Sequence, residues 1–255
     1  MSSERPLVLH TEDTSAPCAI RFEQVSKVYR LFESERKRFL AAFSKRVPFE
    51  EVRANDCLSF EICRGEAVAF IGRNGAGKST ALKMVTGVAY PTSGTIEVNG
   101  RVSALLELSA GFDAQLTGIE NLRMRARLWG LTKEQVDDLL PRVIEFAELG
   151  TFIKQPLRTY SSGMRARLGF ALAVNIEPDI FVVDEALSVG DKRFAEKCLE
   201  RVHEIISDSK VTVLFVTHSS SSAQEFCRRG IVLASGKAVF DGPIDAAIEH
   251  YDTRE

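Results

Sequence analysis

The stretch Gly72-Arg73-Asn74-Gly75-Ala76-Gly77-Lys78-Ser79-Thr80 decides the fold of this chain. It matches the pattern G-x-x-x-x-G-K-[S/T], in which glycines let the backbone approach phosphate groups and consecutive N–H groups face the anion. The apolar run Ala67–Ile71 before it predicts a buried strand. The residues after it predict a helix, whose N-terminus favours an anion. We therefore expect a phosphate-binding loop (P-loop); a structural glycine-rich turn is the alternative.

The residues of the loop have separate expected roles in binding a nucleotide's phosphates. Lys78 is expected to reach the β- and γ-phosphates, and the Ser79 hydroxyl to ligate Mg²⁺. The rest of the loop and the first helical turn are expected to contact the phosphates through Gly72, Asn74, Gly75, Gly77 and Thr80.

A second signal is the run Ile180-Phe181-Val182-Val183-Asp184-Glu185. Its apolar residues predict a buried parallel strand, and α/β sheets place ligands at the carboxyl ends of such strands. Asp184 is then expected to hold Mg²⁺, and Glu185 to polarise the attacking water as general base. An apolar run that ends in Asp-Glu is also typical of a solvated strand end, but the upstream P-loop favours the functional interpretation.

A third signal is Tyr160-Ser161-Ser162-Gly163-Met164-Arg165, which precedes the apolar helical stretch Leu168–Val174. Ser161 is a good helix N-cap, and capping alone would explain its place.

Outside these motifs the chain is predicted to alternate strands and helices, which indicates the α/β class. Residues 1–18 predict a loose tail. The segments 117–120 (Thr-x-x-Glu) and 132–135 (Thr-x-x-Gln) predict capping boxes at the start of two helices. Asn99-Gly100 predicts a β-hairpin.

Composition narrows the function classes. The 255 residues carry 33 Lys and Arg against 35 Asp and Glu, a net charge of −2, so no nucleic-acid partner is expected. The 5 cysteines are scattered, which argues against a disulfide framework or a zinc site and favours a reducing compartment. No apolar run is long enough to span a bilayer, and no secretory signal is visible. We expect a cytoplasmic protein, or one held at a membrane by a partner.

The order of P-loop, Ser-x-Gly helix start, apolar-Asp-Glu strand and His218 after a strand resembles the nucleotide-binding subunit of ATP-binding-cassette (ABC) transporters, across about residues 19–250. The resemblance implies a single nucleotide-binding domain over 19–255. It would have a RecA-like P-loop NTPase core, an antiparallel β-subdomain and a helical subdomain at about 112–175.

The resemblance also implies roles for residues far from the P-loop. Ser161 and Gly163 match the signature motif, which contacts the γ-phosphate held by the opposite subunit of a dimer. Ser162 and Met164 depart from the usual Gly and Gln of that motif, as a subfamily mark would. Asp191 matches the D-loop aspartate that crosses the dimer interface.

Two further positions match the family pattern. His218 matches the switch histidine of the H-loop, where a satisfied structural histidine is the alternative. Tyr29 matches the A-loop aromatic that stacks on adenine, where an ordinary half-buried strand tyrosine is the alternative.

One expected residue is missing. Between the hairpin and Thr117 the family usually places a Gln that ligates Mg²⁺ and senses the permease, and Gln115 comes too late to match it. Glu107 and Ser109 are the candidate replacements.

The strings 110–122, 160–171 and 184–191 look like the ATPases that export undecaprenyl-linked polysaccharides and teichoic acids. This resemblance implies an ATPase with ATP and Mg²⁺ as cofactors. Two copies would form a homodimer and work with an integral membrane permease on a lipid-linked polysaccharide. The implied location is the cytoplasmic face of the inner membrane, peripheral through the permease. The alternatives are the ATPase of another ABC exporter, for drugs or lipids, a non-transport ABC ATPase and a P-loop kinase.

The segment 33–46 predicts a short basic amphipathic helix. It would either pack one face on the core or lie at the membrane face. In the second case Arg36, Lys37 and Arg38 would touch the permease or the diphosphate head of a lipid-linked glycan.

Overall fold

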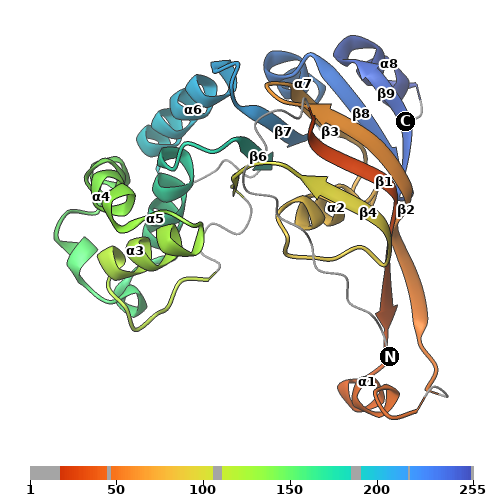
Figure 1. Ribbon diagram of the computed structural model, residues 1–255, viewed down its shortest axis with the longest axis horizontal. Helices are drawn as coiled ribbons and strands as arrows, with labels where there is room; N and C mark the ends of the chain where they lie inside the picture. The colour runs from red at the N-terminus through yellow and green to blue at the C-terminus, as the bar shows by residue number, and fades with distance from the viewer. Residues whose placement is uncertain (1–17, 45–46, 106–110, 185–190, 218, 254–255) are drawn as a thin grey trace.

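The computed structural model describes residues 18–44, 47–105, 111–184, 191–217 and 219–253. Its centre is a six-stranded sheet in the order β5-β6-β7-β3-β8-β9, with only the edge strand β9 antiparallel to its neighbour (Figure 1). Long apolar runs form its middle, because strands covered on both faces have no polar side. The strands are β3 (Ala67–Ile71), β5 (Val102–Ala104), β6 (Ile180–Asp184), β7 (Thr212–Thr217), β8 (Arg229–Ala234) and β9 (Lys237–Pro243).

A separate three-stranded antiparallel sheet has the order β2-β1-β4. It consists of β1 (Cys18–Leu31), β2 (Glu50–Cys63) and β4 (Ser93–Val98). Its inward side chains share a hydrophobic cluster with β3: Phe22 stacks on Phe60, and Phe60 meets Phe70 edge-on. This sheet therefore covers one face of the central sheet together with α2 (Lys78–Val85).

The prediction of a hairpin at Asn99-Gly100 is wrong. β4 pairs with β1, whereas β5 runs parallel to β6 in the other sheet. The carboxylate of Asp179 accepts a hydrogen bond of 2.7 Å from the backbone N–H of Arg101 and holds the chain beside β6. The glycine turn thus joins two sheets, because this tertiary contact outweighs the local preference for a hairpin.

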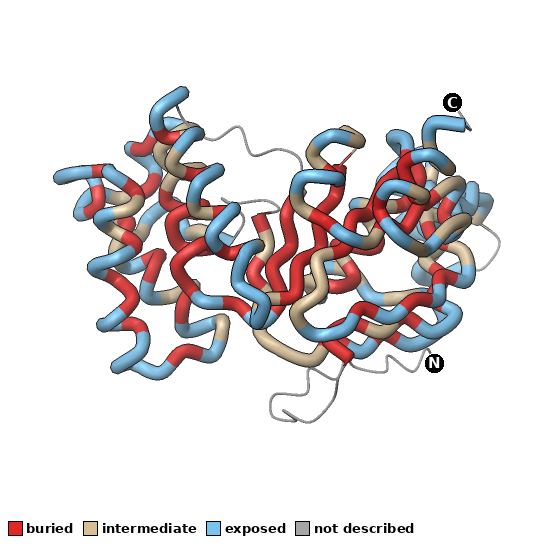
Figure 2. The backbone as a smooth tube through the Cα atoms, turned by 90° about the horizontal axis from the view of Figure 1, so that it is seen from above, coloured by how far each residue is buried: buried red, intermediate tan, exposed pale blue. Residues whose placement is uncertain are grey.

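The opposite face of the central sheet is covered by helices (Figures 1 and 2). Buried side chains of these helices pack against β3, β6 and β7, including Phe170, Phe194 and Ala247. The helices are α5 (Ser162–Asn175), α6 (Lys192–Ser207), α7 (Ser220–Phe226) and α8 (Ile244–Asp252).

A helical lobe extends to one side of the sheets (Figure 1). It comprises α3 (Gly118–Leu128), α4 (Lys133–Ala147), the 3₁₀ turns η1 (Gly150–Lys154) and η2 (Leu157–Thr159), and α5. Both predicted capping boxes are confirmed: Thr117 and Glu120 start α3, and Thr132 and Gln135 start α4. The lobe has its own apolar cluster, which includes Leu122, Val143 and Leu168.

The predicted basic helix is shorter in the structure: α1 spans Glu35–Ala41 and has no buried residue. The interpretation in which one of its faces packs on the core is therefore wrong. Across the described ranges, no helix is both long and apolar enough to cross a membrane.

Candidate functional site

The P-loop joins β3 to α2, as its sequence predicts. Gly77 is the N-cap of α2, with φ of +101° and no side-chain cap. A Cβ at Gly77 would lie 2.4 Å from the carbonyl oxygen of Ala54, so only glycine fits this turn against β2. The first N–H groups of α2 consequently have no capping side chain and can face an anion.

A network of backbone hydrogen bonds fixes the far side of the loop. The N–H of Gly236, in the β8–β9 turn, donates to the carbonyl of Ala76 at 3.0 Å. The Asp56 N–H of β2 in turn donates to the carbonyl of Gly236 at 2.8 Å. The turn therefore ties the P-loop to the antiparallel sheet.

Asn55 is a site residue that the sequence analysis missed. Its side chain is 0% exposed, and its amide nitrogen donates to the carbonyl of Gly77 at 3.2 Å. Its amide oxygen has no hydrogen-bond partner. A polar side chain in a strand gives no sequence signal for this role, because its P-loop partner is a tertiary neighbour.

Lys78 and Ser79 begin α2 in different surroundings. The Lys78 ammonium lies over its own loop and donates to the carbonyl oxygens of Gly72 and, at 3.0 Å, Arg73. Ser79 is exposed at the helix start. Both side chains therefore lie at the end of α2 that attracts phosphate.

The sheet places Asp184 near this edge. β7 lies between β3 and β6, with Ile71 opposite Thr217 and Val216 opposite Asp184. The carboxyl ends of these parallel strands lie at the same edge of the sheet. The half-buried Asp184 therefore lies at that edge, two strands away from the strand that leads into the P-loop.

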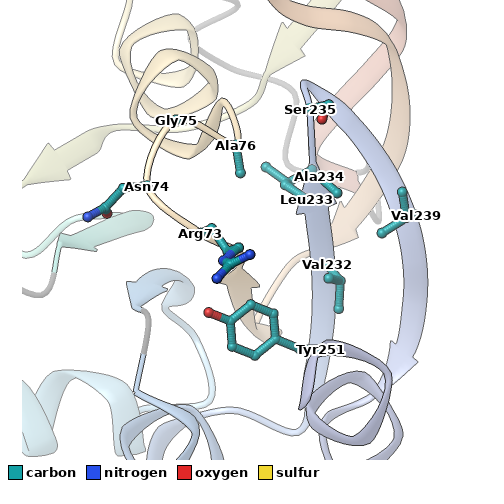
Figure 3. Close-up of a pocket in the computed structure, with 10 residues that line it drawn as sticks. All are labelled: Arg73, Asn74, Gly75, Ala76, Val232, Leu233, Ala234, Ser235, Val239 and Tyr251. Atoms are coloured by element: carbon teal, nitrogen blue, oxygen red, sulfur yellow. The ribbon is translucent and has the colours of Figure 1, made fainter. Parts of the chain in front are cut away.

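A cavity of about 270 Å³ adjoins the P-loop on the side of β8, β9 and α8. Figure 3 shows the hydroxyl of Tyr251, from α8, turned toward Arg73, and Asn74 pointing away from the cavity. Apolar residues of β8 and β9, such as Val232 and Val239, complete the lining. The sequence analysis singled out no residue of these carboxyl-terminal elements.

Ser161 and Gly163 lie at the start of α5, in the helical lobe. The Ser161 hydroxyl caps the helix by accepting from the N–H of Met164 at 3.1 Å. A Cβ at Gly163 would meet only the Ser161 hydroxyl, at 3.9 Å, so the helix start has open space beside it. The cavity beside the P-loop takes no lining residue from α5.

Asp191 is engaged within the chain. It is the N-cap of α6 and accepts from the N–H of Phe194 at 3.0 Å. Its carboxylate also pairs with Arg167 of α5 at 2.6 Å. The bond from the Phe194 N–H, together with the positive charge of Arg167, lowers the pKa of Asp191.

Tyr29 lies near the distal end of β1, opposite Val52 of β2. Its side chain is 36% exposed, and the Lys27 ammonium lies 5.2 Å from its ring centroid. Val52 is close in sequence to Asn55, so β2 connects the ring's neighbourhood with the P-loop.

Several predicted residues fall outside the described part of the chain: Glu185, His218, Glu107 and Ser109. Gln115, which is described, is engaged with Arg158 at 3.4 Å.

The described residues fit a Mg²⁺-nucleotide. In the described ranges, no group of three or more His, Cys, Asp or Glu side chains could hold a metal ion. A Mg²⁺ ion bound through Ser79, Asp184 and nucleotide phosphates needs no such group, because Mg²⁺ usually keeps few protein ligands. The uncapped start of α2 supplies the N–H groups that a triphosphate requires.

A P-loop that opens a helix, in the same parallel sheet as a strand ending in aspartate, defines a P-loop nucleotide-binding protein. The added antiparallel sheet and helical lobe give it the architecture of an ATP-binding cassette.

Known proteins are similar to this chain in sequence and in fold. The family model described as ABC transporter matches residues 56–188. The teichoic acids export ATP-binding protein TagH of Staphylococcus haemolyticus is 39% identical, over 92% of this chain and 88% of its own. The O-antigen export system ATP-binding protein RfbB of Klebsiella pneumoniae is 41% identical, over 91% of this chain and 96% of its own. The TagH of Bacillus anthracis is 41% identical over 91% of this chain, which spans only 42% of that relative's length.

The fold has solved counterparts. The structure of an ATP-binding subunit of an ABC transporter superposes with a TM-score of 0.69 at 24% identity, covering 92% of this chain and 94% of that one. A dimeric post-hydrolysis structure of the cassette MJ0796, bound to ADP and Pi, gives 0.68 at 21% identity, over 88% and 98%. The chain belongs to the ABC transporter family.

Proposed function

We propose that this chain is the ATP-hydrolysing subunit that powers export of a lipid-linked cell-surface polymer, a polysaccharide or a teichoic acid, through a separate membrane permease. The match to relatives named for teichoic acid and O-antigen export, over nine-tenths of the chain, carries this proposal. The chain would act at the cytoplasmic face of the membrane, held there by the permease.

In the proposed reaction, the P-loop N–H groups and Lys78 bind the β- and γ-phosphates, and Tyr29 stacks on adenine. Ser79 and Asp184 would hold Mg²⁺, and the ion would supply positive charge that neutralises the phosphates. Glu185 accepts a proton from the attacking water, and His218 orients the γ-phosphate and that water. Lys78 must leave the carbonyls of its own loop for this work, since nucleotide phosphates are its stronger acceptors.

Two copies are proposed to pair head to tail. Ser161 and Gly163 of one copy would then contact the γ-phosphate held by the other, and Asp191 would cross the interface. Support comes from the open space at the start of α5 and from the absence of α5 residues in the lining of the cavity beside the P-loop. ATP would stabilise the closed pair and hydrolysis would release it, because only ATP supplies the bridging γ-phosphate.

Replacement of the proposed base, Glu185→Gln, in native cells tests the function. We expect a lipid-linked glycan or polyol-phosphate polymer to accumulate, and mass spectrometry of the lipid extract would name the cargo. Lys78→Ala is the matched control for loss of nucleotide binding and should give the same accumulation.

If no polymer accumulates although the Glu185→Gln protein binds ATP, the cargo assignment fails and another ABC exporter becomes the explanation. If the purified Glu185→Gln protein hydrolyses ATP at the wild-type rate, the assignment of the base fails.

A further inference from the structure

Two thiols lie side by side in the antiparallel sheet, outside the site described above. Cys18 is the first residue of β1 and Cys63 is the last residue of β2. The two are direct cross-strand partners in the antiparallel pairing of these strands. Cys18 is 2% exposed, whereas Cys63 is exposed to solvent. The proposed ATPase reaction uses neither of them.

The backbone around Cys63 makes this a non-hydrogen-bonded pair. The Cys63 N–H donates to the carboxylate of Glu66 at 2.8 Å, and the Cys63 carbonyl accepts from the Glu66 N–H at 3.2 Å. The Cys18 carbonyl accepts from the side-chain amide of Asn99 at 3.2 Å. In such a pair the Cα atoms lie about 4.5 Å apart and the side chains approach most closely. A disulfide spans Cα separations of about 4.4–6.8 Å, so the pairing suits one.

Both thiols belong to the outer face of the sheet. Residues directly opposite each other on antiparallel strands project to the same face. The Cys18 thiol donates a hydrogen bond to the carboxylate of Glu61, which pairs with Arg21 at 3.4 Å on that face. Cys63 follows Glu61 by two residues on the same strand, so its side chain projects to the same side.

The two thiols differ in reactivity. Burial raises the pKa of the Cys18 thiol to about 11, and Glu61 and Cys63 contribute to this shift. Cys18 therefore remains protonated at neutral pH, and solutes do not reach it directly. Cys63 is the member of the pair that meets a solute, because it is exposed.

We propose that Cys18 and Cys63 form a redox modification site, which hydrogen peroxide converts to a reversible disulfide. The Cys63 thiolate attacks one peroxide oxygen and the O–O bond breaks. Cys63 becomes a sulfenic acid, and the departing hydroxide takes up the proton that Cys63 released, which gives water. The Cys18 sulfur then attacks the sulfenic sulfur, the S–O bond breaks, and the Cys18 proton leaves with the hydroxyl as a second water. Two thiols are thus oxidised while one peroxide is reduced to two waters.

A buried thiol beside an exposed one limits how far oxidation proceeds. The sulfenic acid of Cys63 meets the Cys18 thiol before it meets a second peroxide, so it stops at the reversible disulfide and not at the irreversible sulfinic acid. Cys57 is a matched contrast on the same strand. It is also exposed, but its sulfur lies 3.7 Å from the hydroxyl of Ser26 and not beside a thiol.

The disulfide should stabilise the fold without changing the nucleotide site. It would close residues 18–63 into a loop and restrict the unfolded chain, which should raise the thermal midpoint by about 5 °C. Cys63 precedes the amino-terminal end of β3, whereas the P-loop follows the carboxyl end of that strand. We therefore expect the oxidised chain to keep the ATPase rate of the reduced one.

Peptide mapping of the purified full-length chain tests the proposal. Cys57→Ser serves as the background, because trypsin leaves Cys57 and Cys63 in one peptide, residues 54–64. After hydrogen peroxide and alkylation, we expect this peptide to be linked to the one that carries Cys18. Dithiothreitol should remove both the link and the rise in thermal midpoint.

Single replacements separate the roles of the two thiols. With Cys18→Ser added, no link and no rise should appear, and Cys63 should proceed to the sulfinic acid. With Cys63→Ser added, Cys18 should stay reduced; this exposed position keeps the test valid if Cys18→Ser destabilises the fold. In the chain without replacements, Cys57 should reach the sulfinic acid at a peroxide concentration at which Cys63 stops at the disulfide.

Oxidation inside cells decides whether the site operates there. Cells that produce the chain are exposed briefly to hydrogen peroxide, quenched in acid and alkylated. We expect the linked fraction to rise about tenfold over untreated cells and to fall again after the peroxide is removed, since cellular dithiols reduce accessible disulfides.

The proposal is overturned if peroxide yields no linked peptide, or if Cys63 is oxidised to the sulfinic acid equally with and without Cys18. A link that forms in the purified chain but not in peroxide-treated cells overturns it as well. These readouts are a peptide mass and a thermal midpoint, so their failure is distinct from failure of the proposed export function.

Discussion

Asn55 shows how one buried amide supports the P-loop. Its nitrogen holds the carbonyl of Gly77, while its oxygen lies in the interior without a partner. An unsatisfied buried oxygen costs free energy, so the hydrogen bond to the loop must offset it. Asn55 therefore holds the loop in place and, on balance, stabilises the fold.

We expect Asn55→Ala to lower the free energy of unfolding by about 2 kcal/mol, because it leaves a small cavity and removes the bond to Gly77. Asn55→Asp should cost more at neutral pH, since a buried carboxylate would face the carbonyl oxygen of Gly77. Urea unfolding measures both. An Asn55→Asp protein more stable than Asn55→Ala at neutral pH would contradict this account.

The cysteines should divide into two classes of reactivity. Burial raises the pKa of Cys18 to about 11, and the pKa values of Cys198 and Cys227 to about 12 each. Cys57 and Cys63 are exposed on β2. Because the thiolate is the nucleophile, Ellman's reagent at pH 8 should react rapidly with two thiols of the folded chain and with all 5 in urea. Cys57→Ser/Cys63→Ser should remove the rapid phase, and a rapid phase that persists would contradict the assignment.

At the scale of residues, the sequence predicts functional residues that lie next to one another in the chain. The P-loop could be read directly because its glycines, Lys78 and Ser79 are consecutive. Asn55 and Tyr251 could not, since each meets the loop only after distant strands and helices have packed.

At the scale of elements, a sequence motif predicted the structure correctly where its side chains and backbone groups lie within one turn of the same helix. Both capping boxes formed because Thr and Glu or Gln three residues later satisfy each other's donors. The Asn99-Gly100 hairpin did not form, because Asp179 and β6 compete for the chain. The prediction of the basic helix located α1, and of its two interpretations the one with a face packed on the core is wrong, because no residue of α1 is buried.

The α3 cap supplies a prediction with a pH dependence. Thr117→Ala should destabilise the chain by about 1 kcal/mol at neutral pH, measured by urea unfolding. Hydrogen bonds from the Thr117 N–H and hydroxyl hold the pKa of Glu120 below its ordinary value of 4.5. A lowered carboxyl pKa stabilises the fold above pH 4.5, and this contribution is lost as pH falls through the lowered value.

The difference between the wild type and Thr117→Ala should consequently shrink in acid. Thr132→Ala in a Glu134→Gln background is the control: its Gln135 partner does not titrate, and the second change removes the carboxyl of Glu134, whose pKa is lowered by a hydrogen bond from its own backbone N–H and by one from Thr132. An equal narrowing for both variants would show that Glu120 is not responsible.

At the scale of the whole molecule, three apolar clusters divide the structure. One lies between the two sheets, one under the helices of the opposite face, and one within the helical lobe. The helical lobe therefore has its own core, while α5 also packs on the central sheet. We expect the lobe to move as a unit against the P-loop side when two copies close.

Light scattering of the purified chain checks that closure. With ATP, Glu185→Gln should form dimers, because the γ-phosphate persists and bridges the P-loop of one copy to α5 of the other. Adding Ser161→Glu should abolish the dimer while leaving the monomer folded, since the new carboxylate would oppose the phosphate. Glu35→Gln, which neutralises an exposed carboxylate of α1, should leave the dimer intact. Dimers that form equally with ADP would contradict the bridging role.

Because of the β8–β9 turn, opening of the P-loop can be monitored by amide hydrogen exchange. Gly236 donates its N–H to the P-loop and accepts a hydrogen bond from the N–H of Asp56, so this one residue links the P-loop to β2. Solvent reaches the Gly236 amide only when the loop loosens, and that opening weakens the hold on β2. Bound nucleotide that stabilises the loop should therefore slow hydrogen exchange of the Asp56 amide as well. The antiparallel sheet would record the occupancy of a site whose phosphates it never touches.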